Sequence, residues 1–150
     1  MNTRWTPHAT VATIVERDGR FLLVEEIAEL GSPVLNQPAG HIEKGETVIQ
    51  AALRETLEET GWQVSVEALL GIYIYAAPND ITYHRYCLIA KAISPVANAK
   101  LDTGIIGPRW LNLDEVRQST QLRSPMVLRC IEDYLAGKRY PLELISEYQA

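Results

Sequence analysis

Five glutamates lie within seventeen residues of this chain, at positions 43, 46, 55, 58 and 59. Carboxylates that are brought close together repel one another, and each raises the pKa of its neighbours. A hard divalent cation that takes oxygen ligands removes this penalty. The residue types and their spacing therefore predict a magnesium site.

The segment that carries three of these acids is expected to be a helix. At about 100° per residue, Glu55, Glu58 and Glu59 share one stripe along roughly one and a half turns. Thr47 is placed to cap the start of this helix, and Gly61 to end it. The helix would then present its acids to a cleft.

The opposite face of this helix is expected to pack on the core. Ile49, Leu53 and Leu57 repeat every fourth residue, as the buried stripe of an amphipathic helix does. The alternative for the acidic side is a plain solvated face, with Arg54 in an i,i+4 ion pair. The preceding loop, 37–40, favours the chemical interpretation, because its proline and glycine are unusual for an ordinary helix entry.

The chain resembles the Nudix hydrolase family in the segment from Gly40 to Gly61. The residues that match the Nudix box of this family are Gly40, Glu46, Arg54, Glu55, Glu58, Glu59 and Gly61. Thr56 and Trp62 depart from the pattern, since the family usually has aliphatic residues there, and these departures affect local packing. Shorter matches outside the box resemble the NudJ subgroup, and they cover residues 7–12, 36–41, 77–78, 122–125 and 139–143.

This resemblance implies a fold and an activity. The fold class is α/β, a Nudix α/β/α sandwich with a mixed β-sheet between helices, and residues 1–150 would form a single Nudix hydrolase domain. The activity is Mg²⁺-dependent hydrolysis of phosphoanhydride bonds in nucleoside di- and triphosphates, and the NudJ-like matches add hydroxymethylpyrimidine pyrophosphate. The alternative is a nucleotide-binding sensor that does not hydrolyse. Such domains usually lose box acids, whereas this chain keeps all of them.

The resemblance also implies the metal ligands. Glu58 and Glu59 are the expected direct ligands, with the Gly40 carbonyl as a third, because a glycine lets the backbone approach a cation closely. Glu55 is expected to bind a further metal ion, to act as the general base, or to do both in turn. The expected cation is Mg²⁺, with Mn²⁺ as the second choice.

Two further box residues are catalytic candidates beside Glu55. Arg54 is expected to orient Glu55 or Glu59 through a forked hydrogen bond. Glu46 either supports the metal or its water, or only complements the helix dipole. Many relatives supply one more acid from outside the box, and Asp80 and Asp102 are the candidates here, with a solvated turn as the alternative for each.

Substrate contacts are less specific in the sequence. Five aromatic residues are candidates to stack on a flat ring of the substrate: Trp5, Tyr73, Tyr75, Tyr83 and Trp110. The alternative for each of them is packing in the core or the sheet. Arg85 and Arg109 are candidates to hold phosphate, with a surface role as the alternative. His41 follows the box glycine and either touches phosphate or packs in its loop.

Composition fits a compact enzyme domain. A chain of 150 residues with 47% hydrophobic content can bury one core. The net charge of −5, without a basic run, argues against nucleic-acid and membrane partners and leaves small nucleoside or heterocycle phosphates. No apolar signal segment is seen, and Cys87 and Cys130 lack zinc spacing, so a cytoplasmic protein with two free buried thiols is expected. Nothing in the sequence indicates the oligomeric state.

The remaining segments are expected to form strands and helices around the box. Residues 10–15 and 21–26 alternate like strands on either side of an Asp18-Gly19 turn signal, which predicts a hairpin. Further strands are expected at 64–70, 72–75, 83–92 and 109–113, and helices at 113–119 and about 125–136.

Overall fold

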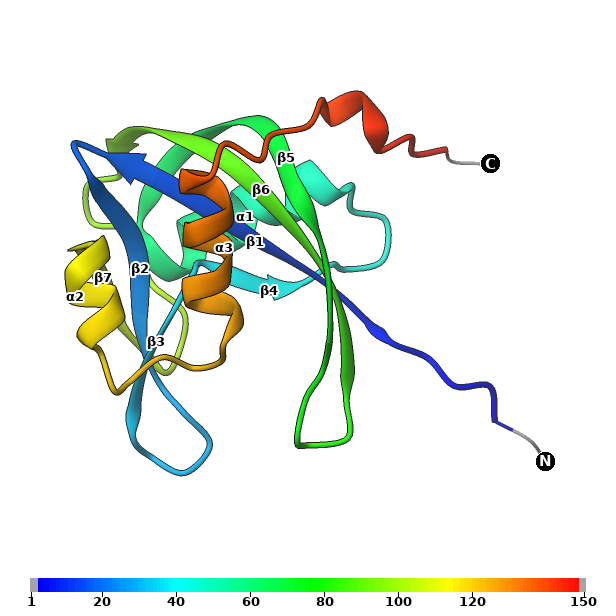
Figure 1. Ribbon diagram of the computed structural model, residues 1–150, viewed down its shortest axis with the longest axis horizontal. Coiled ribbons are helices and arrows are strands. Elements are labelled where there is room, and N and C mark those ends of the chain that lie inside the picture. Colours follow the sequence, from blue (N-terminus) through cyan, green and yellow to red (C-terminus); the bar gives the residue numbers. More distant parts are fainter. Residues whose placement is uncertain (1–2, 149–150) are drawn as a thin grey trace.

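The computed structural model describes residues 3–148, which form seven strands, three α-helices and one short 3-10 helix (Figure 1). The strands are β1 (His8–Arg17), β2 (Arg20–Ile27), β3 (Pro33–Asn36), β4 (Ala39–His41), β5 (Trp62–Ala76), β6 (Thr82–Pro95) and β7 (Ile105–Asn112). The helices are α1 (Val48–Thr60), α2 (Leu113–Gln118), α3 (Met126–Leu135) and η1 (Leu142–Leu144). In the part of the chain that is described, no helix has the length and apolar character needed to cross a bilayer.

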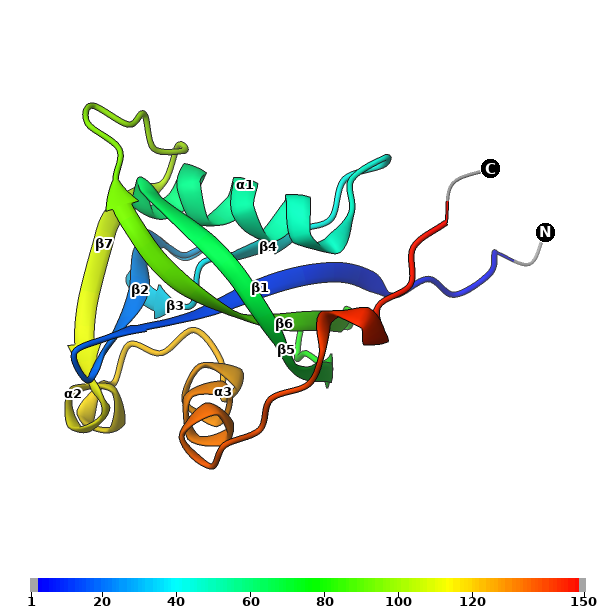
Figure 2. The same cartoon turned by 90° about the horizontal axis from the view of Figure 1, so that it is seen from above.

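The strands form one mixed sheet between two layers of helices. The strand order is β3-β2-β1-β6-β5, with β4 paired to β1 and β7 paired to β2. β1 runs parallel to β6, and the other pairings are antiparallel. Helix α1 covers one face, while α2 and α3 lie on the other (Figure 2). The α/β/α sandwich expected from the sequence is confirmed.

The turns and strand ends follow local chemistry. The φ angles of Asp18 and Gly19 are both positive, at 52° and 77°. The two-residue turn of a β-hairpin requires such angles. The predicted hairpin is therefore confirmed. Strand β5 runs through Gly71 without a break, where two separate strands were expected, because register shifts near Gly71 absorb the irregularity within one strand.

Helix α1 has well-defined ends. Thr47 accepts a hydrogen bond from the Gln50 backbone at 3.1 Å, and the Gln50 side chain accepts one from the Thr47 backbone at 3.0 Å, which together form a capping box. Gly61 ends the helix in the left-handed conformation, with φ 73°, as a C-terminal glycine commonly does. The Glu147 carboxylate adds a contact at 3.2 Å to the Val48 N–H. The expected cap and stop are confirmed.

The prediction of which face of α1 packs on the core is wrong. Leu53 and Leu57 are 38% and 40% exposed. The face that packs on β1, β5 and β6 consists mainly of small residues: Val48, Ala51, Ala52 and Thr56. Small side chains let the helix lie close to the sheet, and this approach also brings the acids against the backbone of β4. A four-residue repeat of apolar side chains did not identify the side that meets the sheet.

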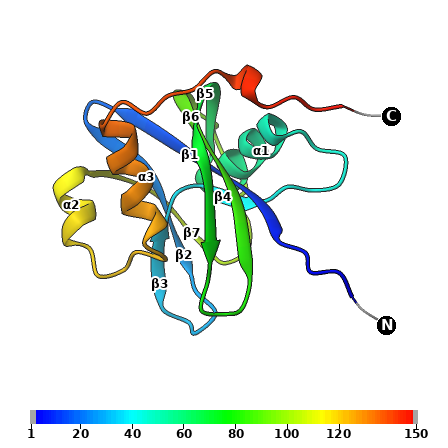
Figure 3. The same cartoon turned by 45° about the vertical axis from the view of Figure 1, so that its right-hand side comes forward.

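The other face of the sheet holds the larger core. Phe21, Leu23 and Ile131 pack there between the sheet and α3. Cys87 and Cys130 belong to the same cluster and are both free and buried, as expected. After α3 the chain crosses the edge of the sheet toward the α1 side (Figure 3), where Tyr140 pairs with Leu69 of β5. The C-terminal segment thus joins the two helical layers.

Candidate active site

Arg54 is the centre of the acidic cluster on α1. Its Nη1 donates to Glu55 at 2.8 Å and to Glu58 at 3.2 Å. Its Nε and Nη2 donate to the two carboxylate oxygens of Glu46, and Nη2 also reaches the His41 carbonyl at 3.1 Å. One guanidinium therefore holds three box glutamates and the loop that precedes the helix.

Glu46 acts on Arg54 rather than on the helix end. The helix cap is Thr47, and Glu46 instead accepts a hydrogen bond from the Glu43 backbone at 2.9 Å. Its hydrogen bonds with Arg54 lower the pKa of Glu46 to about 2, so this carboxylate is ionised at neutral pH. The same contacts raise the pKa of Arg54 above its usual range. The structure thus places Glu46 as the fixed counter-ion of Arg54.

Glu59 and Glu55 are directed toward the backbone of β4. Glu59 is only 8% exposed and accepts a hydrogen bond from the Ala39 N–H at 2.7 Å. Burial and, to a smaller extent, the carboxylates of Glu26, Glu55 and Asp102 together raise the pKa of Glu59 to about 8, against the hydrogen bond from Ala39, which lowers it. Burial also raises the pKa of Glu55, in spite of its contact with Arg54. Both groups therefore hold negative charge at a cost that a cation would relieve.

Gly40 is required for space at this site. A Cβ atom at position 40 would overlap the Glu55 carboxylate. The φ of Gly40 is not positive, so its backbone conformation does not by itself demand glycine. The absence of a side chain lets Glu55 lie directly against the Gly40 backbone, where a carbonyl and carboxylates come together.

The donor set suits a hard divalent cation. The oxygens of Glu55, Glu58, Glu59 and the Gly40 carbonyl are the kind of ligand that Mg²⁺ prefers. Among residues 3–148, no three acidic, histidine or cysteine side chains already converge as a ready-made metal cluster. Arg54 forms ion pairs with Glu55 at 2.8 Å and with Glu58 at 3.2 Å. The residues fit the ion chemically, and the guanidinium competes with it for two of the carboxylates.

Of the two acids considered outside the box, only Asp102 lies beside α1. Its backbone N–H donates to the Glu58 carbonyl at 3.0 Å. Asp80 lies instead in the turn between β5 and β6, with φ 66°. Sequence reasoning did not weigh Glu26, whose carboxylate also acts on Glu59. Its only sequence signal was its position at the end of the apolar strand β2, next to the loop that borders the cleft.

A cleft of about 770 Å³ opens beside this cluster. It lies between the β2–β3 hairpin and the β5–β6 hairpin, which both extend downward in Figure 1. Gly40, His41, Tyr75, Tyr83 and the buried Arg85 are among the residues that line it. Its volume is in the range of small-molecule sites. Two of the five aromatic candidates and one of the two arginine candidates therefore reach the cleft.

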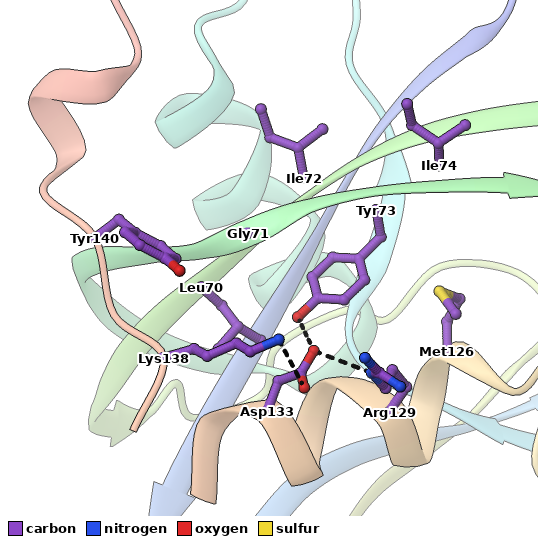
Figure 4. A pocket seen from close by; sticks show the side chains of 10 residues that line it. All are labelled: Leu70, Gly71, Ile72, Tyr73, Ile74, Met126, Arg129, Asp133, Lys138 and Tyr140. Atoms are coloured by element: carbon purple, nitrogen blue, oxygen red, sulfur yellow. Dashed lines mark hydrogen bonds and ion pairs between the residues drawn. The ribbon is translucent and has the colours of Figure 1, made fainter. Parts of the chain in front are cut away.

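The other three aromatic candidates have packing roles or lie at the surface. Trp110 packs edge-on against Trp62 with ring centroids 5.3 Å apart, and Trp5 is 63% exposed. Tyr73 donates to Asp133 at 2.7 Å (Figure 4). Arg109, the second arginine candidate, is exposed and lies 3.5 Å from Glu25. None of these residues lines the cleft beside the box.

Tyr73 belongs to a second cavity, of about 490 Å³, on the α3 side of β5 (Figure 4). The Asp133 carboxylate in this cavity is held by Tyr73, by Arg129 at 3.3 Å and by Lys138 at 3.2 Å. Its charge is therefore paired within the protein. This network joins α3 to β5 and has a structural role.

The two departures from the box pattern are accommodated by specific contacts. Thr56 is buried, and its hydroxyl donates to the Ala52 carbonyl at 2.7 Å and lies 2.9 Å from the Thr13 hydroxyl of β1. Trp62 packs on Trp110, as described above. A hydroxyl pair thus replaces the aliphatic contact between α1 and the sheet.

Comparison with known proteins agrees with this geometry. The NUDIX domain family matches residues 5–129. The chain is 37% identical over 142 residues to the phosphatase NudJ of Escherichia coli strain K12, covering 95% of this chain and 92% of that protein. A solved NUDIX hydrolase from Nitrosomonas europaea is 47% identical, with a TM-score of 0.92 over 95% of this chain and 98% of that one. A UDP-X diphosphatase, 19% identical with a TM-score of 0.74 over 93% of this chain and 68% of that one, shares the fold alone.

The chain therefore belongs to the NUDIX domain family, and it is a Nudix hydrolase. Within that class, its similarity to phosphatase NudJ extends over nearly the whole length of both proteins. This agrees with the subgroup that the short matches outside the box indicated.

Proposed function

We propose that this protein hydrolyses phosphoanhydride bonds in small nucleotide-like substrates with the help of Mg²⁺. Nucleoside di- and triphosphates are the first substrates to consider, and hydroxymethylpyrimidine pyrophosphate is the second. The observation that carries the proposal is that Glu55 and Glu59 lie against the backbone of Gly40 and Ala39, two residues that line a nucleotide-sized cleft. Mn²⁺ is the second choice of cation, and the cytoplasm is the proposed location.

The proposed residue roles are those that the resemblance to the family implies. Glu58, Glu59 and the Gly40 carbonyl are the proposed metal ligands, and Glu55 is a further ligand or the general base. A bound divalent cation would neutralise phosphate oxygens and lower the pKa of water. Arg54 keeps Glu55 in position at 2.8 Å. Burial raises the pKa of Glu55 in the absence of a cation, and a bound cation would lower it.

Release of phosphate and pyrophosphate from a panel of nucleotides tests this proposal. ADP, UDP, CTP, GTP and hydroxymethylpyrimidine pyrophosphate are incubated with the protein in Mg²⁺, in Mn²⁺ and in EDTA. We expect product from at least one of them in Mg²⁺ and none in EDTA. Tight nucleotide binding without product in either metal would favour the sensor function and contradict hydrolysis.

A further inference from the structure

Arg85 on β6 is a buried cation without a carboxylate partner. It is 8% exposed, and it is the only buried arginine among residues 3–148. Its Nη2 donates to the Gln37 side chain at 2.8 Å, and its Nε has no hydrogen-bond partner. Within the described residues, no acidic oxygen lies within 4 Å of the guanidinium.

This arrangement is costly for the folded protein. A buried charge without a counter-ion loses its hydration and gains no ion pair in return. Other arginines near the cleft or on the same sheet are neutralised: Arg123 lies 2.9 Å from Glu26, and Arg109 lies 3.5 Å from Glu25. Arg85 therefore carries a positive charge that nothing within the described protein balances. An anionic ligand would balance it.

Gln37 holds the guanidinium in a fixed orientation. It is fully buried, and its own amide donates to the Val127 carbonyl at 2.7 Å. The acceptor oxygen of Gln37 is therefore directed to Arg85 rather than free to rotate. A guanidinium fixed in this way loses little conformational entropy when it binds an anion.

The sheet register places Arg85 two strands away from the segment that carries Gly40. Thr10 of β1 pairs with Arg85 on one side and with His41 on the other. Two strand spacings therefore separate Arg85 from the segment of Gly40, about 10 Å between backbones. Both residues line the same cleft.

We propose that Arg85 binds one phosphate of a diphosphate while the other phosphate lies at the box acids. This inference rests on the proposed function and deepens it, because it assigns a residue that binds the second phosphate. Arg85 is then a substrate-binding residue, and Tyr75 and Tyr83 beside it line the part of the cleft left for the group that carries the diphosphate.

Binding of methylenediphosphonate, which has no base and cannot be hydrolysed, tests this inference. Its affinity for the full chain in Mg²⁺ is measured by calorimetry for the wild type, Arg85→Gln and Arg109→Gln. We expect Arg85→Gln to weaken binding by about 10- to 100-fold, as the loss of a charge-assisted contact does. Arg109→Gln makes the same change in net charge outside the cleft and should stay within about twofold.

Thermal unfolding of the same variants separates recognition from a structural role. The substitution Arg85→Gln keeps an amide that can donate to Gln37, and it removes a buried charge that has no counter-ion. The variant should therefore melt at the same temperature as the wild type or at a higher one. Unchanged affinity in Arg85→Gln, or wild-type binding weaker than about 10 mM, would overturn the inference. A lower melting temperature with unchanged affinity would show that Arg85 is structural.

The two proposals fail in different ways. Hydrolysis by the wild type together with unchanged affinity in Arg85→Gln leaves the proposed function standing and removes the role of Arg85. If Arg85→Gln weakens diphosphonate binding but the wild type hydrolyses no nucleotide, the role of Arg85 stands and the proposed function falls.

Discussion

At the scale of single residues, Arg54 explains how the acidic cluster is tolerated. Its one positive charge is shared by Glu46, Glu55 and Glu58, which leaves excess negative charge beside Gly40. Glu46 holds Arg54 through two hydrogen bonds, and its low pKa keeps that anchor ionised. The remaining acids are therefore held in place and remain short of positive charge, which is the condition that favours a divalent cation.

Glu58→Gln is predicted to separate activity from stability. Glu58 is a proposed metal ligand with a partly exposed side chain, and removing its charge also relieves repulsion with Glu55. We expect the rate of nucleotide hydrolysis to fall by at least about 100-fold. Mutation of a residue that only hydrogen-bonds to a metal ligand already lowers metal affinity or activity roughly 10- to 100-fold. The free energy of unfolding in urea should change by less than about 1 kcal/mol.

Glu132→Gln is the matched control, because Glu132 is exposed on α3 and lies outside the cleft. This variant should keep the wild-type rate. A loss of stability in Glu58→Gln as large as its loss of activity would show that Glu58 is a structural acid.

At the scale of elements, the position of α1 depends on a hydroxyl pair between helix and sheet. The Thr56 hydroxyl donates to the Ala52 carbonyl, so the Thr13 hydroxyl must be the donor in their mutual contact at 2.9 Å. Both groups are buried and both are satisfied. This contact fixes the distance between α1 and β1, and β1 in turn pairs with the β4 segment that carries Gly40.

A double-mutant cycle at Thr13 and Thr56 tests this contact. Thr56→Val restores the aliphatic residue usual in the box but leaves the Thr13 hydroxyl buried without a partner, which should cost about 1–3 kcal/mol of unfolding free energy. Thr13→Val together with Thr56→Val replaces both polar groups and should recover most of that loss. Urea denaturation measures all of the variants. Strictly additive losses would contradict the assigned pair.

At the scale of the whole molecule, Asp133 joins the α3 layer to the sheet. Burial alone would raise the pKa of Asp133, but hydrogen bonds from Tyr73, Lys138 and Arg129 outweigh burial and lower it. Figure 4 shows the three donors around this carboxylate. Because the ionised form is favoured in the folded state, Asp133 stabilises the fold at pH values above its unfolded pKa.

The stability that Asp133 supplies should therefore depend on pH. We expect Asp133→Asn to lose about 1.5–3 kcal/mol of unfolding free energy at pH 7, the range for hydrogen bonds to a charged group. The difference from the wild type should stay constant down to the unfolded pKa of about 3.9 and shrink as the pH falls through the lower folded pKa. Urea denaturation at several pH values measures it, with Glu132→Gln on the same helix as control. A difference independent of pH would contradict this assignment.

Much of the fold and the chemistry could be predicted from the sequence, because both depend on local features. The hairpin follows from the backbone freedom of Asp18-Gly19, and the ends of α1 follow from Thr47 and Gly61. The box acids share one helix and the loop before it, so their spacing alone brings them together. The assignment of all 150 residues to one domain stays a prediction, as does the absence of nucleic-acid and membrane partners.

The tertiary structure decided which side chains meet across the sheet. Leu53 and Leu57 lie outside the core, Asp102 rather than Asp80 approaches α1, and Arg85 rather than Arg109 lines the cleft. These outcomes depend on strand register and on how closely a helix approaches a sheet, which join residues far apart in the chain. Periodicity within one segment contains no information about the partner that the segment will meet. The sequence by itself therefore indicated the reaction chemistry, and the packing of distant strands determined which residues line the cleft.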